Sequence, residues 1–434
     1  MKFVIVGGGP TGMRLADNLS KNGRNEVVLI EGKKRLGGCW KLDWVGGYMC
    51  EHSPRIMTES YKRVMELVST LPLEDPYREV YGSKLQTSLK FIKYNLQNLS
   101  VTDNIKFLTA VYSIGKGDRR VMTGWVDDNN ISTSGRKGIK NLCLSLADHP
   151  DRLACQAFFR AIRESFSNRA KMIQFRHGDK WIQLWEERLN DRKNLQICKG
   201  EEVRDITTRD SKVTSVLVGD RRVRGDIFIF AIPLWNLKEL GKICSSDRFR
   251  SNWMPWDGFK KFCSDSSYSS IGIQLHFTSP QGLSKNWCQT CMGDWSIITL
   301  ISSDFLDEYS KDPEIKEVWS CALVDFYTKS KYLDKTPGKL ELQEIVDEVV
   351  RQLRVTSGKN LKPKKVTVNI DWNEKGKWDM RESAYTVTPK GPLRMKGQLE
   401  NLYAVGPHNL PDISVMEGGF QAADIFCKKL GNKK

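Results

Sequence analysis

The N-terminal segment combines a strand pattern, a glycine-rich turn and a helix pattern in a fixed order. The turn contains Gly7, Gly9 and Gly12 in the spacing G-x-G-x-x-G. A β-branched run precedes it at 2–6, helix-like apolar spacing follows at 13–19, and a second strand is predicted at 26–30. This second strand ends at Glu31. The complete order predicts a parallel βαβ unit that binds an adenine dinucleotide.

Each residue of this pattern has a separate physical role. Gly7 allows a tight turn, Gly9 lets the backbone approach a pyrophosphate, and Gly12 lets the helix pack close to the strand. The N-terminus of the helix offers free N–H groups and partial positive charge. Glu31 is expected to accept hydrogen bonds from both ribose hydroxyls, and its charge would repel the 2′-phosphate of NADP. The alternative is a βαβ unit that binds no nucleotide.

Composition places the chain among globular proteins. Its 434 residues are enough for two domains, and 40% hydrophobic with 28% charged residues excludes disordered and fibrous classes. The net charge is +16, but the lysines and arginines are scattered, with only short clusters such as Lys428 and Lys429. We therefore expect a solvated basic surface suited to an acidic small-molecule substrate, and no nucleic-acid partner.

Cysteine usage and hydropathy suggest a cytoplasmic protein. The 11 cysteines are an odd number without framework-like spacing, as expected in a reducing compartment. Cys288 and Cys291 form a C-x-x-C, but no second pair accompanies them, so we expect structural thiols and no metal site. Because a core strand is predicted at 2–6, we expect no signal peptide. No apolar run approaches the roughly 18 residues of a membrane span.

The remaining patterns indicate a discontinuous nucleotide domain. Helices are predicted at 60–71, 155–166, 340–353 and 418–425, with an irregular polar patch at 115–140. Strands are predicted at 199–206, 213–218, 226–233, 270–277, 296–301, 319–327, 366–370 and 402–405. The nearly continuous apolar segment 226–233 is typical of a buried parallel strand. No second G-x-G-x-x-G follows, which disfavours an enzyme with two dinucleotide domains.

The predicted fold class is α/β, with two domains. A Rossmann-like domain that binds the nucleotide is expected to comprise 1–57, 174–241 and 396–434. A mixed α+β substrate domain, made of a helical insertion and a sheet, is expected to comprise 58–173 and 242–395.

Two further motifs resemble flavoproteins. Gly37 and Gly38 follow Glu31 in the pattern Glu-x5-Gly-Gly, which is similar to flavoproteins of the glutathione-reductase type. Segments 401–406 and 416–419 resemble the C-terminal signature of the flavin amine oxidase superfamily, which includes monoamine and polyamine oxidases, protoporphyrinogen oxidases and phytoene desaturases. Val203 and the 226–233 strand match the middle block of that family. The resemblance implies FAD as the cofactor.

The resemblance also implies a set of cofactor-binding residues. They are Gly7, Gly9, Gly12, Glu31, Gly32, Arg35, Gly37, Gly38, Trp40, Arg55, Val203, Gly406, Met416 and Glu417. In the family, the helix that begins near Met416 points its N-terminus at the flavin pyrimidine, where its dipole would stabilise the negative charge of reduced flavin. An ordinary flexible helix start is the alternative for Gly418 and Gly419.

Arg55 has two possible roles. The segment around it resembles the Gly-Pro-Arg of protoporphyrinogen oxidases, although Ser53 replaces the glycine. The resemblance places Arg55 near the flavin and the substrate pocket, where its fork of donors could hold a carboxylate or phosphate of the substrate. The structural alternative is an arginine that pairs with a cofactor oxygen or with an acidic residue at the domain interface.

Several departures from the family limit the functional prediction. Val415 stands where monoamine oxidases have an aromatic residue, and no lysine lies in 270–277, where those enzymes place one near flavin N5. Tyr385 and Trp372 are candidates to line the substrate chamber, with a core role as the alternative. His408 is a candidate acid or base, with a hydrogen-bonding bystander as the alternative.

We therefore expect an FAD-dependent oxidoreductase of the amine-oxidase type. A substrate hydride would pass to flavin N5, and dioxygen would be the re-oxidant. One alternative is a flavin-dependent mutase or isomerase of the same fold. Another is a non-catalytic binding protein of the Rab GDP-dissociation-inhibitor type. Neither the substrate nor the oligomeric state follows from the sequence.

Overall fold

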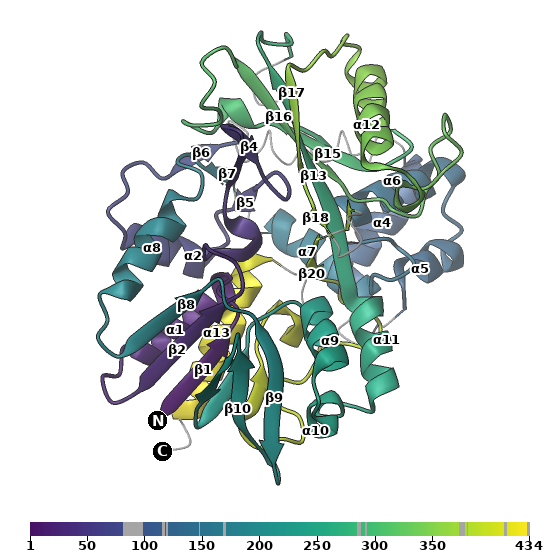
Figure 1. The fold of residues 1–434 in the computed structure, drawn as a ribbon. Coiled ribbons are helices and arrows are strands. Elements are labelled where there is room, and N and C mark those ends of the chain that lie inside the picture. Colours follow the sequence, from purple (N-terminus) through teal and green to yellow (C-terminus); the bar gives the residue numbers. More distant parts are fainter. Residues whose placement is uncertain are drawn as a thin grey trace.

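A computed structural model gives the arrangement of the chain (Figure 1). It describes residues 1–80, 99–114, 118, 120–146, 148–167, 171–283, 288–290, 293–372, 378–379, 381–411 and 415–431.

A parallel sheet lies at the centre of the first domain. Among the described residues it has five strands, in the order β21, β12, β1, β2, β8. In chain order they are β1 (Lys2–Val6), β2 (Glu26–Glu31), β8 (Leu195–Lys199), β12 (Ile227–Phe230) and β21 (Leu402–Ala404). Every neighbouring pair is parallel, as when Val4 lies between Val28 and Phe228. The sheet is assembled from three distant parts of the sequence, so the Rossmann-like domain is discontinuous.

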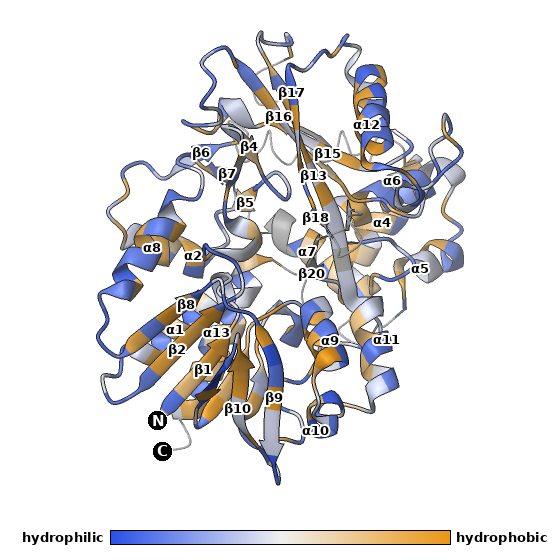
Figure 2. Ribbon diagram, viewed as in Figure 1, coloured by the Kyte–Doolittle hydropathy of each residue, from blue (hydrophilic) through white to orange (hydrophobic). Residues whose placement is uncertain are grey.

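Alternate side chains of these strands point to opposite faces of the sheet and build two cores. Val4 and Val6 pack into one core, whereas Phe3 and Ile5 pack into the other. Burial of each such side chain contributes about 1.5–3 kcal/mol. Figure 2 shows β1 and β2 in the orange of hydrophobic residues.

Each face of the sheet has its own cover. The face of Val4 is covered by the antiparallel strands β9 (Val203–Arg209), β10 (Lys212–Val218) and β11 (Arg221–Arg224), and by α9 (Leu234–Ile243), α10 (Asp247–Arg250) and α11 (Trp256–Ser266). The face of Phe3 is covered by α1 (Pro10–Ser20), α8 (Lys180–Asn190) and α13 (Met416–Gly431).

An antiparallel sheet forms the centre of the second domain. Its path among the described strands is β14, β15, β16, β13, β17, and β20 pairs with one end of β13. The strands are β13 (Ser267–Phe277), β14 (Cys288–Thr290), β15 (Ile297–Ile301), β16 (Glu317–Leu323), β17 (Lys365–Asn369) and β20 (Arg381–Tyr385). Helix α12 (Leu342–Ser357) packs Ile345, Val349 and Leu353 against this sheet.

A helical unit with a core of its own completes this domain. It contains α4 (Val101–Ser113), α5 (Met122–Asp128), α6 (Thr133–Leu146) and α7 (Cys155–Ser167). The prediction of an irregular patch at 115–140 was wrong, because α5 and part of α6 lie in it. Trp125 and Ile139 from these two helices are buried with Phe158 and Phe159 of α7. The helical signal is weak because α5 has only 7 residues and α6 contains Gly135 and Gly138.

Short elements lie between the two large sheets in Figure 1. They are the hairpin of β3 (Asp43–Val45) and β4 (Tyr48–Cys50), the small sheet of β5 (Met57–Thr58), β7 (Met172–Phe175) and β6 (Tyr77–Glu79), and helix α2 (Lys62–Ser69). The remaining described elements are one hairpin and four 3-10 turns. The hairpin consists of β18 (Asp371–Trp372) and β19 (Trp378–Asp379), and the turns are η1 (Gly38–Trp40), η2 (Ser302–Asp304), η3 (Pro337–Lys339) and η4 (Pro407–Asn409).

The other predicted elements agree with the structure within a few residues. The segment 226–233 contains β12, which is a buried parallel strand as predicted. Within the described residues, no helix is long and apolar enough to cross a membrane, and no group of side chains could hold a metal ion. Cys291 of the C-x-x-C lies outside the described residues.

Candidate cofactor site

The glycine-rich turn has the backbone that its sequence predicts. Gly7 has φ of +107°, a left-handed conformation that L side chains rarely adopt, and its N–H donates to the carbonyl of Ile30 over 2.8 Å. A Cβ atom at Gly12 would lie 1.8 Å from the carbonyl oxygen of Gly7. Only glycine at position 12 therefore lets α1 approach β1 this closely.

An open cradle lies at the N-terminus of α1. Gly9 is the N-cap residue, and no side chain of the described residues caps this helix end. The nearest atom to a Cβ at Gly9 would be the Cα of Gly38, 3.9 Å away. Gly38 has φ of +55°, and a Cβ there would come within 3.2 Å of the Cα of Gly9. The two glycines thus face each other beside the N–H groups and positive dipole end of α1.

Glu31 is fixed at the end of β2 by backbone donors. Its Oε2 accepts a hydrogen bond from the N–H of Gly8 over 2.7 Å, and its Oε1 accepts from the N–H of Lys33 over 2.8 Å. Its carboxylate is half-buried, and each oxygen has a second lone-pair direction. Glu31 therefore lies beside the cradle, and its predicted contact with a ribose stays a prediction.

The start of β9 lies next to this acid. A Cβ at Gly32 would lie 2.9 Å from the Cγ of Glu202. The N–H of Glu201 donates to the carbonyl of Glu31 over 3.1 Å. Val203 follows directly as the first residue of β9 and is half-buried.

The turn after Glu31 folds back over the glycine-rich loop. The N–H of Gly37 donates to the carbonyl of Gly8 over 2.8 Å. Gly37 and Gly38 both have positive φ, so the turn requires both glycines. Gly38 and Cys39 are exposed, whereas the ring of Trp40 packs edge-on against Phe175, with the ring centroids 6.3 Å apart.

Arg35 holds this turn from outside. Its Nη1 donates to the carbonyl of Leu42 over 2.8 Å, and its Nη2 pairs with the carboxylate of Asp179. Asp179 also accepts from the N–H of Leu42 over 2.9 Å. These contacts are with protein groups, so the predicted contact between Arg35 and the cofactor stays a prediction.

The N-terminus of α13 meets the N-terminus of α1. A Cβ at Gly419 would lie 2.4 Å from the Oγ1 of Thr11, so the small residue permits this approach. The first turns of both helices, which carry partial positive charge, therefore converge beside the cradle. Met416 begins α13 and is buried.

The side chain of Glu417 points to a third helix. Its carboxylate accepts from the N–H of Arg63 at 3.1 Å and from the N–H of Val64 at 3.2 Å, at the start of α2. It also pairs with the guanidinium of Arg63 at 2.9 Å. The carboxylate thus caps α2, and any contact of Glu417 with a cofactor would come from its backbone.

His408 is buried behind the loop that starts at Gly406. The N–H of Gly406 donates to the Oδ1 of Asn409 over 2.9 Å, and a Cβ at Gly406 would lie 2.7 Å from the Cε1 of His408. The Nε2 of His408 has no hydrogen-bond partner among the described residues. Burial lowers the pKa of His408 to about 4, so the ring is neutral near pH 7.

Tyr385 lies in the core beside this histidine. The two ring centroids are 6.4 Å apart, and the Tyr385 hydroxyl donates to the carbonyl of Gly391 over 3.4 Å. Burial raises the pKa of Tyr385. These contacts match the core role that was the alternative for Tyr385. Trp372 pairs through its backbone with Trp378 in the β18–β19 hairpin, and its side chain lies outside the described part.

We predict that His408 makes the stability pH-dependent. Because its pKa is about 4 in the folded state and 6.5 in the unfolded state, the unfolded state binds the proton first. Stability is therefore full above pH 6.5 and falls toward pH 4, by up to about 1.4 kcal/mol per pH unit. Urea unfolding between pH 4 and 7 should show a shallower decline in His408→Asn than in the wild type. The same decline in both would contradict the prediction, and His177→Asn, at a partly exposed histidine, is the control.

Arg55 is engaged by protein groups on three sides. Its Nη1 donates to the carbonyl of Trp40 over 2.7 Å, and its Nη2 donates to the carbonyl of Lys41. Its Nε lies 3.3 Å from the Oε2 of Glu51. These contacts match the alternative in which Arg55 pairs with an acid between the domains, and a role in substrate binding stays a prediction.

The sequence analysis missed the residues that tie this site to the antiparallel sheet. Glu51 is almost fully buried, and Gln274 of β13 binds both its N–H and its carbonyl. A Cβ at Gly272 would lie 1.9 Å from the carbonyl oxygen of Glu51, so this strand position must be glycine. The spacing of Glu51 and Arg55 was a signal in the sequence, but Gln274 and Gly272 carry none without the fold.

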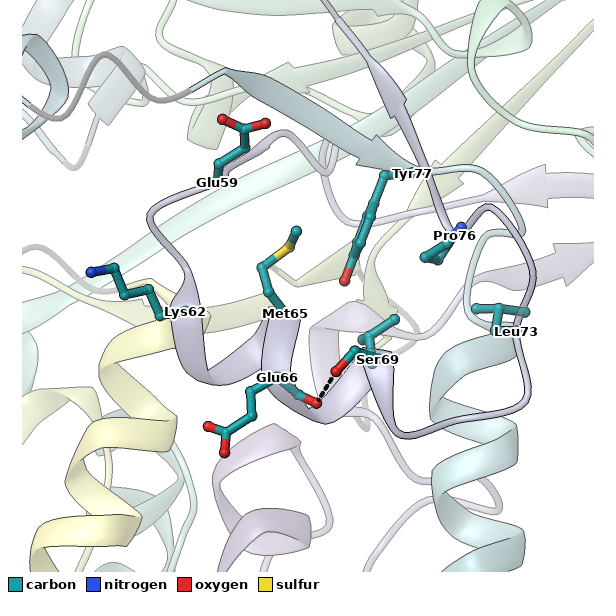
Figure 3. A pocket seen from close by; sticks show the side chains of 9 residues that line it. Glu59, Lys62, Met65, Glu66, Ser69, Leu73, Pro76 and Tyr77 are labelled. Atoms are coloured by element: carbon teal, nitrogen blue, oxygen red, sulfur yellow. Dashed lines mark hydrogen bonds between the residues drawn. The ribbon is translucent and has the colours of Figure 1, made fainter.

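A separate surface cavity lies on the outer side of α2 (Figure 3). Its volume is about 570 Å³, and it is lined by Glu59, Lys62, Met65, Glu66, Val68, Ser69, Leu73, Pro76 and Tyr77. None of the predicted site residues lines it. It is therefore distinct from the cradle at α1.

Comparison with known proteins identifies the first segment and the overall fold. Residues 5–71 match the family of NAD(P)-binding Rossmann-like domains. No curated protein matches the chain by sequence. An oxidoreductase from Methanosarcina mazei superimposes with a TM-score of 0.69 at 16% identity, covering 99% of this chain and 100% of that one.

Two amine oxidases superimpose over the same length. Cyclohexylamine oxidase from Brevibacterium oxydans gives a TM-score of 0.64 at 13% identity, with 99% of each chain covered. A putrescine oxidase bound to putrescine gives 0.65 at 14% identity, covering 100% of this chain and 99% of that one. The chain has the fold of the flavin amine oxidases.

The residues present fit the ribose and pyrophosphate parts of FAD. Gly9 and Gly38 leave space that a Cβ at either position would reduce, and the N-termini of α1 and α13 favour negative charge at that place. Glu31 offers carboxylate oxygens at the edge of the same cradle. Contact of these and the other predicted residues with a cofactor stays a prediction.

Proposed function

We propose that the protein is an FAD-dependent oxidoreductase of the amine-oxidase type. The observation that carries this proposal is the meeting of the first turns of α1 and α13 beside Gly9, Gly38 and Glu31. The match of 5–71 to dinucleotide-binding domains and the cyclohexylamine and putrescine oxidases of the same fold support it. The carboxylate of Glu31 and the Glu-x5-Gly-Gly pattern favour FAD over NADP.

FAD, when bound there, supplies an electron sink that accepts a hydride from a substrate C–H bond and returns the electrons to dioxygen. The chain's own contribution is positioning and electrostatics. The N–H groups at α1 would bind the pyrophosphate, and Glu31 would orient the ribose. The dipole of α13 would favour negative charge at the end of the site near Met416. His408 is neutral and buried, so it is placed to support the loop and not to exchange protons with solvent.

The proposal predicts a yellow protein that is bleached by its substrate. Purified protein should show the absorption bands of oxidised flavin, and anaerobic mixing with polyamines, amino acids and tetrapyrroles should bleach them with one class. Readmission of air should restore the bands and yield hydrogen peroxide.

Other results would assign the protein elsewhere. A colourless protein that cannot be loaded with FAD would contradict the proposal and favour a non-catalytic binding protein. Bound flavin that no substrate bleaches, with conversion of a nucleotide sugar after chemical reduction, would favour the mutase alternative. The cytoplasmic location and the absence of a nucleic-acid partner stay predictions.

A further inference from the structure

Arg55 connects the two domains through buried contacts. The side chain is 8% exposed, and that of its partner Glu51 is 1% exposed. On one side, the guanidinium of Arg55 binds the carbonyls of Trp40 and Lys41, at the end of η1. On the other side, its Nε lies 3.3 Å from the carboxylate of Glu51. The two Nη atoms therefore bind one backbone segment, while the charge of the guanidinium pairs with Glu51.

Glu51 is anchored to the antiparallel sheet of the second domain. Its N–H donates to the Oε1 of Gln274 over 3.1 Å, and its carbonyl accepts from the Nε2 of Gln274 over 2.9 Å. Gly272 lets its backbone lie directly on β13. Burial raises the pKa of Glu51, while the Arg55 cation and the nearby hydroxyls of Ser320 and Ser302 act in the opposite direction. Among these groups, the Arg55 cation favours the charged form of this carboxyl most strongly.

The other end of the connection is the turn that faces the cofactor cradle. Gly38 lies opposite Gly9, and Cys39 is exposed in the same turn. Within η1 the N–H of Trp40 donates to the carbonyl of Gly37 over 2.9 Å. The two carbonyls that Arg55 binds follow immediately. Movement of Arg55 would therefore move the backbone opposite Gly9.

We propose that Arg55 and Glu51 are a positioning pair, which sets the turn 38–41 against the cofactor and ties it to the substrate sheet. This inference rests on the proposed function, because it assigns the pair to the FAD site. In this role the guanidinium of Arg55 binds backbone carbonyls of the protein and does not bind the substrate. A single buried ion pair would thus fix the position of the β13 sheet, and of any substrate that contacts it, relative to the flavin.

The test distinguishes the hydrogen bonds of the Arg55 guanidinium from its positive charge. Arg55→Lys keeps the cation but cannot bind two carbonyls and a carboxylate together. We expect the Kd for FAD to rise about tenfold, as for the loss of one charge-assisted hydrogen bond, with a shifted flavin absorption spectrum. Glu51→Gln should raise the Kd in the same direction. The double variant should be little weaker than either single variant, because the two side chains act as one unit.

A second readout needs no flavin. Hydrogen–deuterium exchange of the Trp40 N–H in apoprotein reports the opening of the turn, because this N–H donates to the carbonyl of Gly37 over 2.9 Å. We expect the exchange to accelerate about tenfold in Arg55→Lys, in line with the loss of the same contact. Arg351→Lys is the matched control, because Arg351 pairs with the buried Glu348 on α12, away from the turn. It should change neither the Kd for FAD nor the exchange rate.

Three outcomes would decide the matter. A raised KM for substrate in Arg55→Lys, with unchanged FAD affinity and Trp40 exchange rate, would overturn the inference and make Arg55 a substrate ligand. Additive effects in the double variant would also overturn it. If the wild type binds no FAD, the proposed function fails, while faster exchange of the Trp40 N–H in Arg55→Lys would still support a pair that positions the turn. If Arg55→Lys does not fold, Glu51→Gln, which keeps both carbonyl contacts, provides the same readouts.

Discussion

Replacing Gly9 by aspartate is expected to abolish FAD binding while leaving the fold intact. The backbone at Gly9 has φ of −71° and ψ of 176°, which any residue can adopt, and the nearest atom to its Cβ would be 3.9 Å away. Aspartate is also a favoured N-cap residue and should stabilise α1 by on the order of a few tenths of a kcal/mol relative to glycine. The stability of the apoprotein should therefore be unchanged or slightly higher.

The same carboxylate would occupy the place expected for the pyrophosphate. It would satisfy the N–H groups at the start of α1 and repel the two phosphates at close range. We expect the Kd for FAD to rise by roughly 100-fold or more, equivalent to at least about 2.7 kcal/mol. Fluorescence titration of apoprotein with FAD measures this directly.

Gly23→Asp is the matched control for Gly9→Asp. Gly23 likewise has room for a Cβ, with no atom within 4 Å, but it follows the opposite end of α1. It should leave FAD affinity unchanged. Full FAD affinity in Gly9→Asp would show that the cofactor does not use this cradle.

Gly12→Ala, unlike Gly9→Asp, is expected to cause a large loss of folding stability. The new methyl group would lie 1.8 Å from the carbonyl oxygen of Gly7 and 3.0 Å from its carbonyl carbon. Alanine is a better helix former than glycine by up to about 1 kcal/mol, but this gain cannot offset a clash with backbone on the adjoining turn. Helix α1 would have to move away from β1, with disruption of the core around Met13 and Ile5.

We expect the free energy of unfolding to fall by about 3 kcal/mol or more in Gly12→Ala. The midpoint of urea unfolding, at unchanged m-value, measures the change. Gly124→Ala in α5 is the control, because the nearest atom to its Cβ would be 4.0 Å away, and it should be neutral or stabilising by up to about 1 kcal/mol. An equal midpoint for Gly12→Ala and wild type would refute the close packing of α1 on β1.

The local features of the first domain could be predicted from the sequence because they depend on neighbouring residues. The strands at 2–6 and 26–31 follow from β-branched runs, and the helix start follows from the glycine-rich turn before Pro10. The structure confirmed the buried parallel strand at 226–233 for the same reason. Strand boundaries shifted by a few residues, as at β16, which ends at Leu323.

The helices in 115–140 could not be predicted from local composition. Trp125 of α5 is buried against Phe159, and both lie in a core that exists only once α4 to α7 have come together. Helix α5 is too short to show a clear period, and Gly135 and Gly138 lower the helix propensity of α6. Tertiary packing, and not helix propensity, stabilises such short helices.

The sequence by itself determined the glycine turn, the acid at its edge and the positions of the main strands, because steric limits on the backbone and the period of apolar residues act over a few neighbours. Only the tertiary structure decided the partners of the long charged side chains. Arg55 binds backbone 14 and 15 residues before it, and Glu417 caps a helix 354 residues before it. The side chains of Arg55 and Glu417 have many conformations of similar energy, and the one each adopts depends on which distant segments the two sheets bring within reach.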